Sequence, residues 1–256
     1  MAVARGEHHR RRPRRRAGGG RAGVAAAGRD VRDGAAPRGP AAVLPRRRAR
    51  AATAVRHARG AVVPDVVLTG RSTADVVDGL AARLAAVAAP GAGPRVVAVD
   101  GRSGTGKTDL AAALARRTGA AVVHLDDLYP GWSGLAAAVE LLGEVLDGLR
   151  SGAPTSHPVW DWARGAYVRE VALPTSGTVV VEGVGAGCAR PVDLLVRLEA
   201  DAELRRARAL ARDGETFTPH WDAWAAQEAE LFSRERFRPD VVLSSATAVG
   251  GEPLWR

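Results

Sequence analysis

The sequence predicts an α/β fold, a three-layer sandwich in which a five-stranded parallel sheet lies between helices. Between residues 95 and 243, five short apolar runs alternate with segments of helical periodicity, which is the pattern of a parallel sheet. The runs are apolar at consecutive rather than alternate positions, and this indicates strands covered on both faces. A glycine-rich segment, residues 101–106, joins the first run to the first helix.

The individual elements follow from these runs in chain order. The predicted strands are 96–99, 121–125, 178–181, 194–198 and 241–243. The predicted helices are 107–118, 135–149, one from Asp201 and one from about His220. Gly119 is expected to end the first of these helices, because glycine readily adopts the left-handed conformation found there.

A further strand and helix are predicted ahead of this core, within residues 66–89. The run 66–68 is strand-like, and Ser72 with Asp75 matches the capping-box pattern at the start of a helix. The apolar side of that helix would consist of Val76, Leu80, Leu84 and Val87. We expect it to pack on the edge of the sheet and to take no part in chemistry.

Residues 101–108 read Gly-Arg-Ser-Gly-Thr-Gly-Lys-Thr, which is typical of a phosphate-binding P-loop. Glycines let the backbone fold around an anion, and the following helix adds the positive end of its dipole. We expect Lys107 to reach the β- and γ-phosphates of a nucleotide and Thr108 to hold Mg²⁺. The residues expected to bind the nucleotide are Gly101, Ser103, Gly104, Thr105, Gly106, Lys107 and Thr108.

Lys107 is also the only lysine among the 37 basic Lys and Arg residues of the chain. A compact ammonium suits the space between phosphates better than the wider guanidinium fork does. The alternative is a glycine-rich turn that binds nothing, and the lysine argues against it.

Charge divides the chain into an arm, residues 1–60, and a domain, residues 61–256. The arm carries 17 arginines against Glu7, Asp30 and Asp33, whereas the whole chain has a net charge of +9, so the domain is net negative. With few large apolar residues, the arm is expected to be disordered. It is interpreted as a solvated or untranslated extension. Nucleic-acid binding is the alternative, but the arm lacks interleaved aromatic residues and any reading module.

Composition also limits the class of the domain. Cys188 is the single cysteine, so no intrachain disulfide is possible, and without a CxxC partner it indicates neither zinc nor redox chemistry. No apolar run approaches the roughly 20 residues of a membrane span. The prediction is a soluble cytoplasmic protein without a membrane partner.

Asp126 and Asp127 follow directly after the predicted strand 121–125. They would therefore lie at the carboxyl edge of the sheet, beside the P-loop, where open α/β sheets bind ligands. One carboxylate can accept the proton of an attacking hydroxyl, and the other can hold Mg²⁺ through water. The alternative is that the pair caps the next turn.

Taken together, the motifs resemble the uridine kinase family of P-loop kinases over about residues 95–243. The resemblance rests on the P-loop, the segment Asp126-Asp127-Leu128-Tyr129, residues 179–183 and the run Arg205, Arg208, Arg212 and Asp213. It implies that Asp126 is the general base, with Asp127 as the fallback, and that Tyr129 contacts the acceptor. It also implies the strand order 2-3-1-4-5, counting the five strands along the chain.

The resemblance extends to residues 158–162, Pro-Val-Trp-Asp-Trp. The family's aspartate at this place holds ribose hydroxyls, which implies a substrate contact for Asp161. Trp160 and Trp162 replace the family's Tyr and Phe, and the His-x-Arg that follows in the family is missing. Strand-like runs flank Arg164 and Gly165, so a hairpin over the site is expected, with the tryptophans either clamping the acceptor or packing on the sheet.

Two further groups complete the expected site. Glu182 ends an apolar strand, where an acidic residue would approach Mg²⁺. Arg205, Arg208 and Arg212 have spacings that place them on one helix face, where guanidinium groups either clamp the triphosphate or are merely solvated. Asp213 is expected to orient one of them. By contrast, Trp221, Trp224, Glu228, Leu231 and Phe232 are expected to be packing residues of the last helix.

The sequence therefore predicts an ATP- and Mg²⁺-dependent kinase for a hydroxyl of a small acceptor, which the resemblance suggests is a nucleoside such as uridine. ATP is favoured over GTP because the single lysine leaves none for an Asn-Lys-x-Asp guanine motif. The alternative function is a regulatory or nucleic-acid-linked P-loop ATPase that uses the basic arm.

Overall fold

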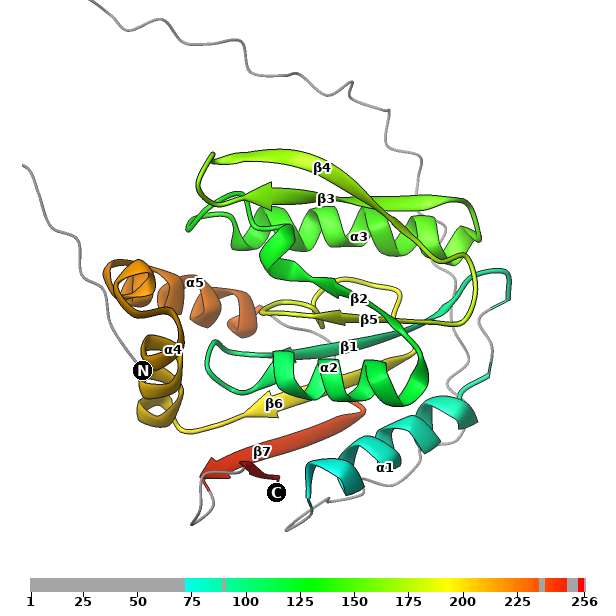
Figure 1. Ribbon diagram of the computed structural model, residues 1–256, viewed down its shortest axis with the longest axis horizontal. Coiled ribbons are helices and arrows are strands. Elements are labelled where there is room, and N and C mark those ends of the chain that lie inside the picture. Colours follow the sequence, from blue (N-terminus) through cyan, green and yellow to red (C-terminus); the bar gives the residue numbers. More distant parts are fainter. Residues whose placement is uncertain (1–71, 89–90, 235–237, 248–252, 256) are drawn as a thin grey trace, which may run out of the picture. The chain divides into compact units, whose positions relative to one another are not determined.

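The computed structural model describes residues 72–88, 91–234, 238–247 and 253–255. The expected arm, residues 1–60, and the expected strand at 66–68 lie outside these described residues. The elements form a three-layer α/β fold around a six-stranded sheet (Figure 1). The predicted fold class, with five parallel strands between helices, is confirmed.

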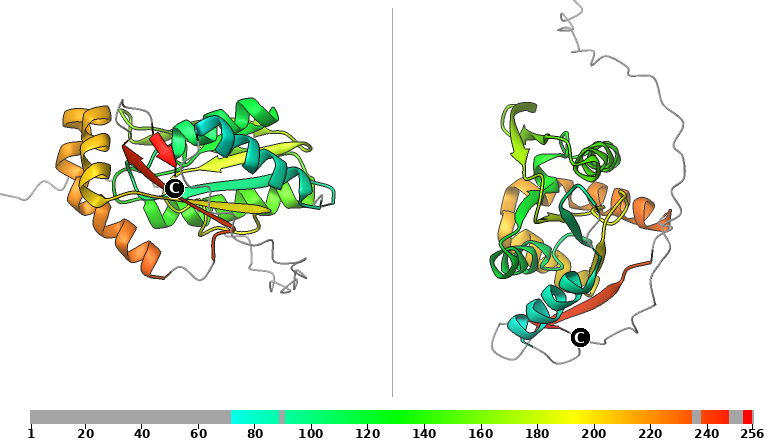
Figure 2. Two further views of the ribbon diagram at one scale, coloured as in Figure 1. Left: turned by 90° about the horizontal axis from the view of Figure 1, so that it is seen from below. Right: turned by 90° about the vertical axis from the view of Figure 1, so that its right-hand side faces the viewer.

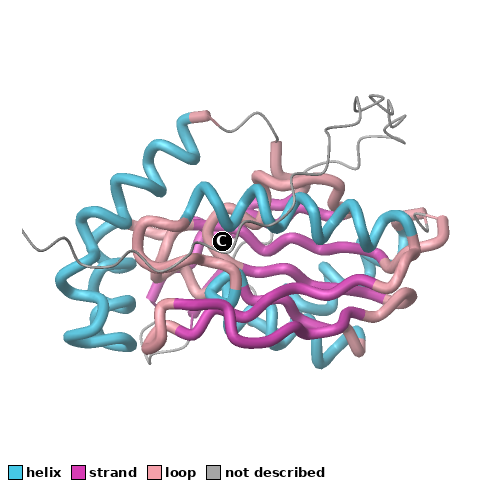
Figure 3. The backbone as a smooth tube through the Cα atoms, turned by 90° about the horizontal axis from the view of Figure 1, so that it is seen from above, coloured by secondary structure: helices cyan, strands magenta, loops and turns pink. Residues whose placement is uncertain are grey.

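The main sheet has the strand order β2-β5-β1-β6-β7-β8. Its parallel strands are β1 (Arg95–Gly101), β2 (Ala121–His124), β5 (Thr178–Glu182), β6 (Leu194–Glu199) and β7 (Val241–Thr247). Counted along the chain, these five lie in the order 2-3-1-4-5, so the order implied by the family resemblance is confirmed. The short strand β8 (Pro253–Trp255), which was not predicted, pairs antiparallel with β7. Figure 3 shows the strands running side by side.

Helices cover both faces of this sheet, as Figures 1 and 2 show. On one face, α1 (Thr73–Ala86) and α2 (Lys107–Thr118) share a buried apolar cluster with alternate residues of β1, such as Val97 and Val99. On the other face, α3 (Leu135–Ser151) and α5 (Trp221–Ser233) pack with the intervening residues, such as Val96 and Ala98. Burial on both faces accounts for the continuous apolar character of the strands.

The predicted helix ends agree closely with the observed ones. At the start of α1, the Ser72 hydroxyl accepts a hydrogen bond from the Asp75 amide, and the Asp75 carboxylate accepts one from the Ser72 amide. The helix ends at Ala86, and Val87 is extended, so Val87 does not extend the apolar side of the helix. Gly119 has a left-handed φ of 68° and ends α2 as expected.

The predicted hairpin forms a separate two-stranded antiparallel sheet of β3 (Thr155–Asp161) and β4 (Ala166–Leu173). Its register shifts between Val159 and Trp160. Gly165 lies in the connecting turn with a φ of 64°, a conformation that favours glycine. The remaining described elements are the short turns η1 (Leu125–Asp127) and η2 (Thr218–His220) and the helix α4 (Ala202–Phe217), which is interrupted at Gly214.

Asp100, near the end of β1, joins the sheet to the loop that follows β5. Its carboxylate is fully buried and accepts hydrogen bonds from the amides of Gly101, Gly185 and Gly187, at 2.7, 2.9 and 3.0 Å. Arg197 on β6 lies 3.2 Å from the same carboxylate. These contacts give a buried charge the partners that it needs.

Replacing Asp100 with Ala should lower the free energy of unfolding by about 3–5 kcal/mol, because it removes the ion pair with Arg197 and leaves buried amides without an acceptor. Urea unfolding followed by circular dichroism measures this. The control is Asp78→Ala, which removes an exposed ion pair with Arg117 and should change stability by at most about 1 kcal/mol. An equally small loss for Asp100→Ala would show that its contacts do not stabilise the fold.

Candidate active site

The predicted P-loop, residues 101–108, runs from the end of β1 into the first turn of α2, and its backbone is packed tightly on both sides. A Cβ atom on Gly101 would collide with the carbonyl of Leu198, and one on Gly104 would collide with the backbone of Arg205. Gly104 and Gly106 have φ values of 81° and 93°, in the region that favours glycine. The glycines therefore let the loop turn and let its neighbours come close.

Lys107 begins α2, and its side chain folds back over the loop. Its ammonium donates a hydrogen bond to the carbonyl of Arg102 at 3.0 Å, and the Thr105 hydroxyl donates to the same carbonyl at 2.9 Å. Burial lowers the pKa of Lys107, and the negative charges of Glu182, Glu228, Asp100 and Asp126 oppose that shift. The lysine is thus buried within a group of carboxylates.

Thr108 and Glu182 lie together, as their predicted shared role requires. The Thr108 hydroxyl donates to Glu182 Oε1 at 3.3 Å, and His124 Nδ1 lies 2.6 Å from the same oxygen. His124 and Glu182 are paired residues of β2 and β5, which explains their contact. The hydrogen bond to Glu182 raises the pKa of His124. His124 was not predicted as a site residue, because only the strand register reveals its partner.

Asp126 and Asp127 lie in η1, directly after β2. The Asp126 residue is exposed, yet the surrounding protein desolvates its carboxyl and raises its pKa; Glu182 raises it further, while Lys107 and Arg212 lower it. Within the described part of the chain, neither aspartate side chain caps the turn. The structure therefore brings Asp126 into the electrostatic neighbourhood of Lys107, Glu182 and Arg212.

The side chains at this edge of the sheet include oxygen ligands of the kind that Mg²⁺ prefers. Thr108 and Glu182 supply a hydroxyl and a carboxylate within hydrogen-bond distance, and Asp127 is partly buried at the same edge. Among the described residues, no three His, Cys, Asp or Glu side chains form a metal cluster. Such a cage is not required, because Mg²⁺ is typically bound by one or two carboxylates together with substrate phosphates and water.

Two residues expected to contact an acceptor have other partners. Tyr129 is only 1% exposed; its hydroxyl donates to the Val184 carbonyl at 3.0 Å, and its ring meets Trp224 edge-on. Burial raises its pKa well above the ordinary value. The structure therefore places the phenol of Tyr129 in the core, with its hydroxyl bound to the Val184 carbonyl.

Asp161 lies at the turn of the hairpin. Its carboxylate accepts hydrogen bonds from the amides of Ala163 and Arg164 and from the Arg164 guanidinium, at 3.0, 2.9 and 2.9 Å. The Arg164 amide is the main cause of its lowered pKa. The aspartate thus orders the hairpin turn.

The hairpin does reach the aspartate segment, through two aromatic residues. The Trp162 indole donates to the Asp126 carbonyl at 3.1 Å, and the Tyr167 hydroxyl donates to the Leu128 carbonyl at 2.7 Å. Trp160 is partly buried and meets Tyr167 edge-on. Trp132 lies 4.8 Å from Trp162 between ring centroids and stacks on His220. Aromatic rings therefore surround the segment that carries the predicted base.

The three arginines of α4 that are expected to bind the triphosphate have different surroundings. Arg205 is mostly buried, and its guanidinium donates to the carbonyls of Ala200 and Ser103 at 3.2 and 3.3 Å. Arg212 forms a two-pronged pair with Asp213, at 2.8 and 2.7 Å, which raises its pKa. Arg208 lies one turn from each, partly buried. In this structure Arg205 binds the backbone of the phosphate loop.

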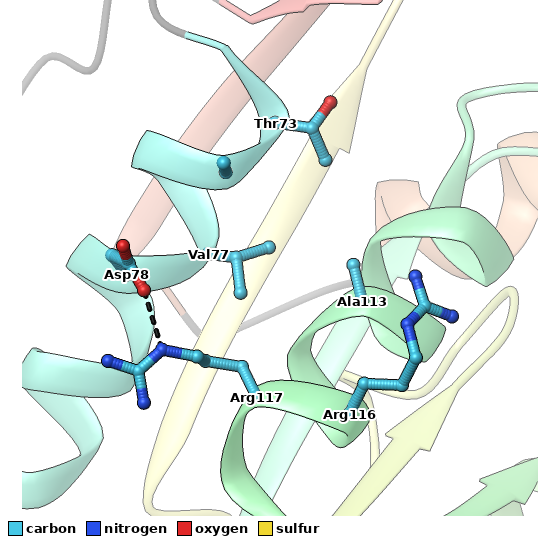
Figure 4. Close-up of a pocket in the computed structure, with 7 residues that line it drawn as sticks. Thr73, Val77, Asp78, Ala113, Arg116 and Arg117 are labelled. Carbon is cyan, nitrogen blue, oxygen red and sulfur yellow. Dashed lines mark hydrogen bonds and ion pairs between the residues drawn. The ribbon is translucent and has the colours of Figure 1, made fainter.

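A groove of about 440 Å³ lies between α1 and α2 (Figure 4). It is lined by Thr73, Ala74, Val77, Asp78, Ala113, Arg116 and Arg117. Arg117 pairs with Asp78 at 2.6 Å across it. None of the predicted site residues lines this groove, so it is separate from the candidate active site.

No family model and no curated protein sequence matches the chain. Among solved structures, it is similar to a candidate fructose transport system kinase from Silicibacter sp., with 24% identity and a TM-score of 0.49 over 68% of this chain and 99% of that chain. A candidate uridine kinase from Bacillus stearothermophilus is 24% identical, with a TM-score of 0.44 over 66% and 97%. Shikimate kinase from Bacteroides thetaiotaomicron is 16% identical, with a TM-score of 0.36 over 59% and 86%.

In the described ranges, no helix has the length and apolar character needed to cross a membrane.

The pairing of His124 with Glu182 predicts a pH-dependent stability. Because the folded state raises the pKa of His124, the pair contributes fully below the unfolded value of about 6.5, and the contribution is lost as pH rises through the folded value. Wild type should exceed His124→Gln in stability by at most about 1 kcal/mol near pH 5.5, since the imidazole is 44% exposed.

Urea unfolding of both proteins near pH 5.5 and near pH 9 measures this difference, which should shrink at the higher pH. A difference of the same size at both values would mean that the pair is not ionic.

Proposed function

We propose that this chain is an ATP-dependent phosphotransferase that transfers the γ-phosphate to a hydroxyl of a small acceptor. The observation that carries the proposal is the arrangement at one edge of the sheet: Lys107 opens α2 after the loop that follows β1, Asp126 lies in η1 directly after β2, and Thr108 is hydrogen-bonded to Glu182 at the end of β5. A carboxylate able to accept a hydroxyl proton and the lysine of a phosphate-binding loop thus share this edge.

The phosphate loop supplies the nucleotide site in this proposal. The amides of residues 104–108 and the positive end of α2 bind the β- and γ-phosphates, and Lys107 exchanges its bond to the Arg102 carbonyl for phosphate oxygens. Thr108 and Glu182 would hold Mg²⁺, and Asp127 would be a further oxygen donor at the same edge. When bound, Mg²⁺ screens the charge of the phosphates.

Asp126 acts as the general base. Its carboxylate accepts the proton of the acceptor hydroxyl while that oxygen bonds to the γ-phosphorus and the bond to ADP breaks. Desolvation, by raising the pKa of Asp126, increases its proton affinity. Arg212, fixed by Asp213, and Arg208 on the same helix stabilise the charge that develops on the transferred group.

The acceptor binds between the hairpin and η1, and the sequence resemblance favours a nucleoside such as uridine. Trp162 is 40% exposed and is anchored to the Asp126 carbonyl, so its ring is available for stacking on a flat or sugar-like molecule. Trp160 packs edge-on against Tyr167 within the hairpin. Because Tyr129 and Asp161 have internal partners, the polar contacts of the acceptor are assigned to Asp126 and Asp127.

A nucleic-acid-linked ATPase is the competing function, and it would use the basic residues 1–60. The proposed base Asp126 supports transfer to an acceptor hydroxyl. Measuring ADP formation with and without small hydroxyl compounds, and with and without RNA or DNA, separates the two. Stimulation by nucleic acid alone would reverse the assignment. We also propose that residues 61–256 act without the arm.

Asp126→Asn keeps the size of the side chain but cannot take a proton. It should reduce acceptor phosphorylation by about 10²–10⁴-fold while ATP still binds. Asp127→Asn, the matched control, should instead raise the Mg²⁺ concentration needed for activity. Steady-state kinetics with varied Mg²⁺ measures both.

If Asp127→Asn loses transfer and Asp126→Asn keeps it, the two roles are exchanged. If both variants keep full transfer, the segment is structural and the proposed base is wrong.

A further inference from the structure

Ser103, in the middle of the phosphate loop, is bound at three of its atoms by α4 and α5. Its amide donates to Glu228 Oε1 at 2.7 Å, and its hydroxyl accepts from the Trp224 indole at 3.0 Å. Its carbonyl accepts from the Arg205 guanidinium at 3.3 Å. These partners come from segments more than 100 residues further along the chain, at the end of the sheet where the loop lies (Figure 1).

Glu228 is an unusual residue for its position. It lies on the buried side of α5 together with Trp221 and Trp224, and it is only 1% exposed. A buried carboxylate is strongly disfavoured unless it is paired and hydrogen-bonded. Here Oε2 has no hydrogen-bond partner among the described residues, and its neighbouring charge is Arg205 at 3.8 Å. The expectation that Glu228 only packs is therefore incomplete.

The contact acts on a segment that needs ordering. The loop contains glycines at 101, 104 and 106, all with positive φ, and glycine loses the most conformational freedom when it is fixed. Gly104 also lies against the Arg205 backbone so closely that no Cβ would fit. Groups that order the loop before a ligand arrives reduce the entropy lost on binding.

We propose that Glu228 is a positioning residue: by accepting the Ser103 amide, it fastens the phosphate loop to α5 and preorganises the loop for a triphosphate. Trp224 reinforces the attachment through the Ser103 hydroxyl, and Arg205 balances the Glu228 charge. The inference rests on the proposed function for the nature of the ligand, whereas the attachment itself is a property of the chain alone.

The test compares Glu228→Ala and Glu228→Gln with Glu230→Ala in the full chain. Glu230 lies on the same helix but is exposed and pairs with Arg234, so it is the matched control. Hydrogen exchange of the peptide 101–108 and calorimetric titration with ATP and Mg²⁺ are measured for each protein.

Glu228→Ala should speed exchange in the loop and weaken ATP binding about tenfold or more, with an equal rise in the KM for ATP. Glu228→Gln, which still offers an oxygen to the Ser103 amide, should recover most of both. Glu230→Ala should match wild type. Because Glu228→Ala removes a buried group, Trp224→Phe provides a milder variant. It keeps an aromatic ring but removes the indole N–H that donates to Ser103, and it should weaken ATP binding about threefold.

Unchanged loop exchange in a folded Glu228→Ala protein, or wild-type affinity in both Glu228→Ala and Trp224→Phe, would overturn the proposal. If wild type binds no ATP, the proposed function fails, and the attachment of the loop to α5 does not serve triphosphate binding. Faster loop exchange in Glu228→Ala would still support the attachment itself.

Discussion

The close backbone packing of the phosphate loop is the constraint on which the rest of the site depends. Gly101 touches the carbonyl of Leu198, and Gly104 touches the backbone of Arg205, at distances that exclude any Cβ. The loop is therefore held between β6 and the start of α4. This position fixes the first turn of α2, and with it Lys107 and Thr108, against the ends of β2 and β5 that carry His124 and Glu182.

Charge is concentrated at that edge and is balanced by specific partners. Asp100 is neutralised by backbone amides and Arg197, Glu228 by the Ser103 amide and Arg205, and Glu182 by Thr108 and His124. Asp126 has a desolvated carboxyl with a raised pKa, and its side chain has no hydrogen-bonded partner in the described part of the chain. Groups with shifted pKa values at the edge where open α/β sheets bind ligands are candidates for chemistry.

Local patterns in the sequence predict most of the fold. The helix 107–118 and the five parallel strands follow from apolar periodicity and glycine positions. The P-loop follows from a motif whose glycines determine its backbone conformation. The sequence cannot show which polar residues face inward, because their partners are distant along the chain. Asp100 and His124 find their partners through the register of neighbouring strands, and Glu228 finds its partner more than 100 residues away along the chain. The burial of Tyr129 could not be predicted either, because the spacing from Asp126 does not distinguish a core phenol from one that faces a ligand.

The proposed function depends above all on binding of the ATP triphosphate by the loop around Lys107. Calorimetric titration of the wild-type chain and of Lys107→Ala with ATP and Mg²⁺, alongside thermal unfolding, tests it directly. Wild type should bind with a Kd of roughly 1 μM to 1 mM, and Lys107→Ala should bind at least about tenfold more weakly with an unchanged fold. Equal affinity in the two folded proteins, or no binding by wild type at millimolar ATP, would contradict the account.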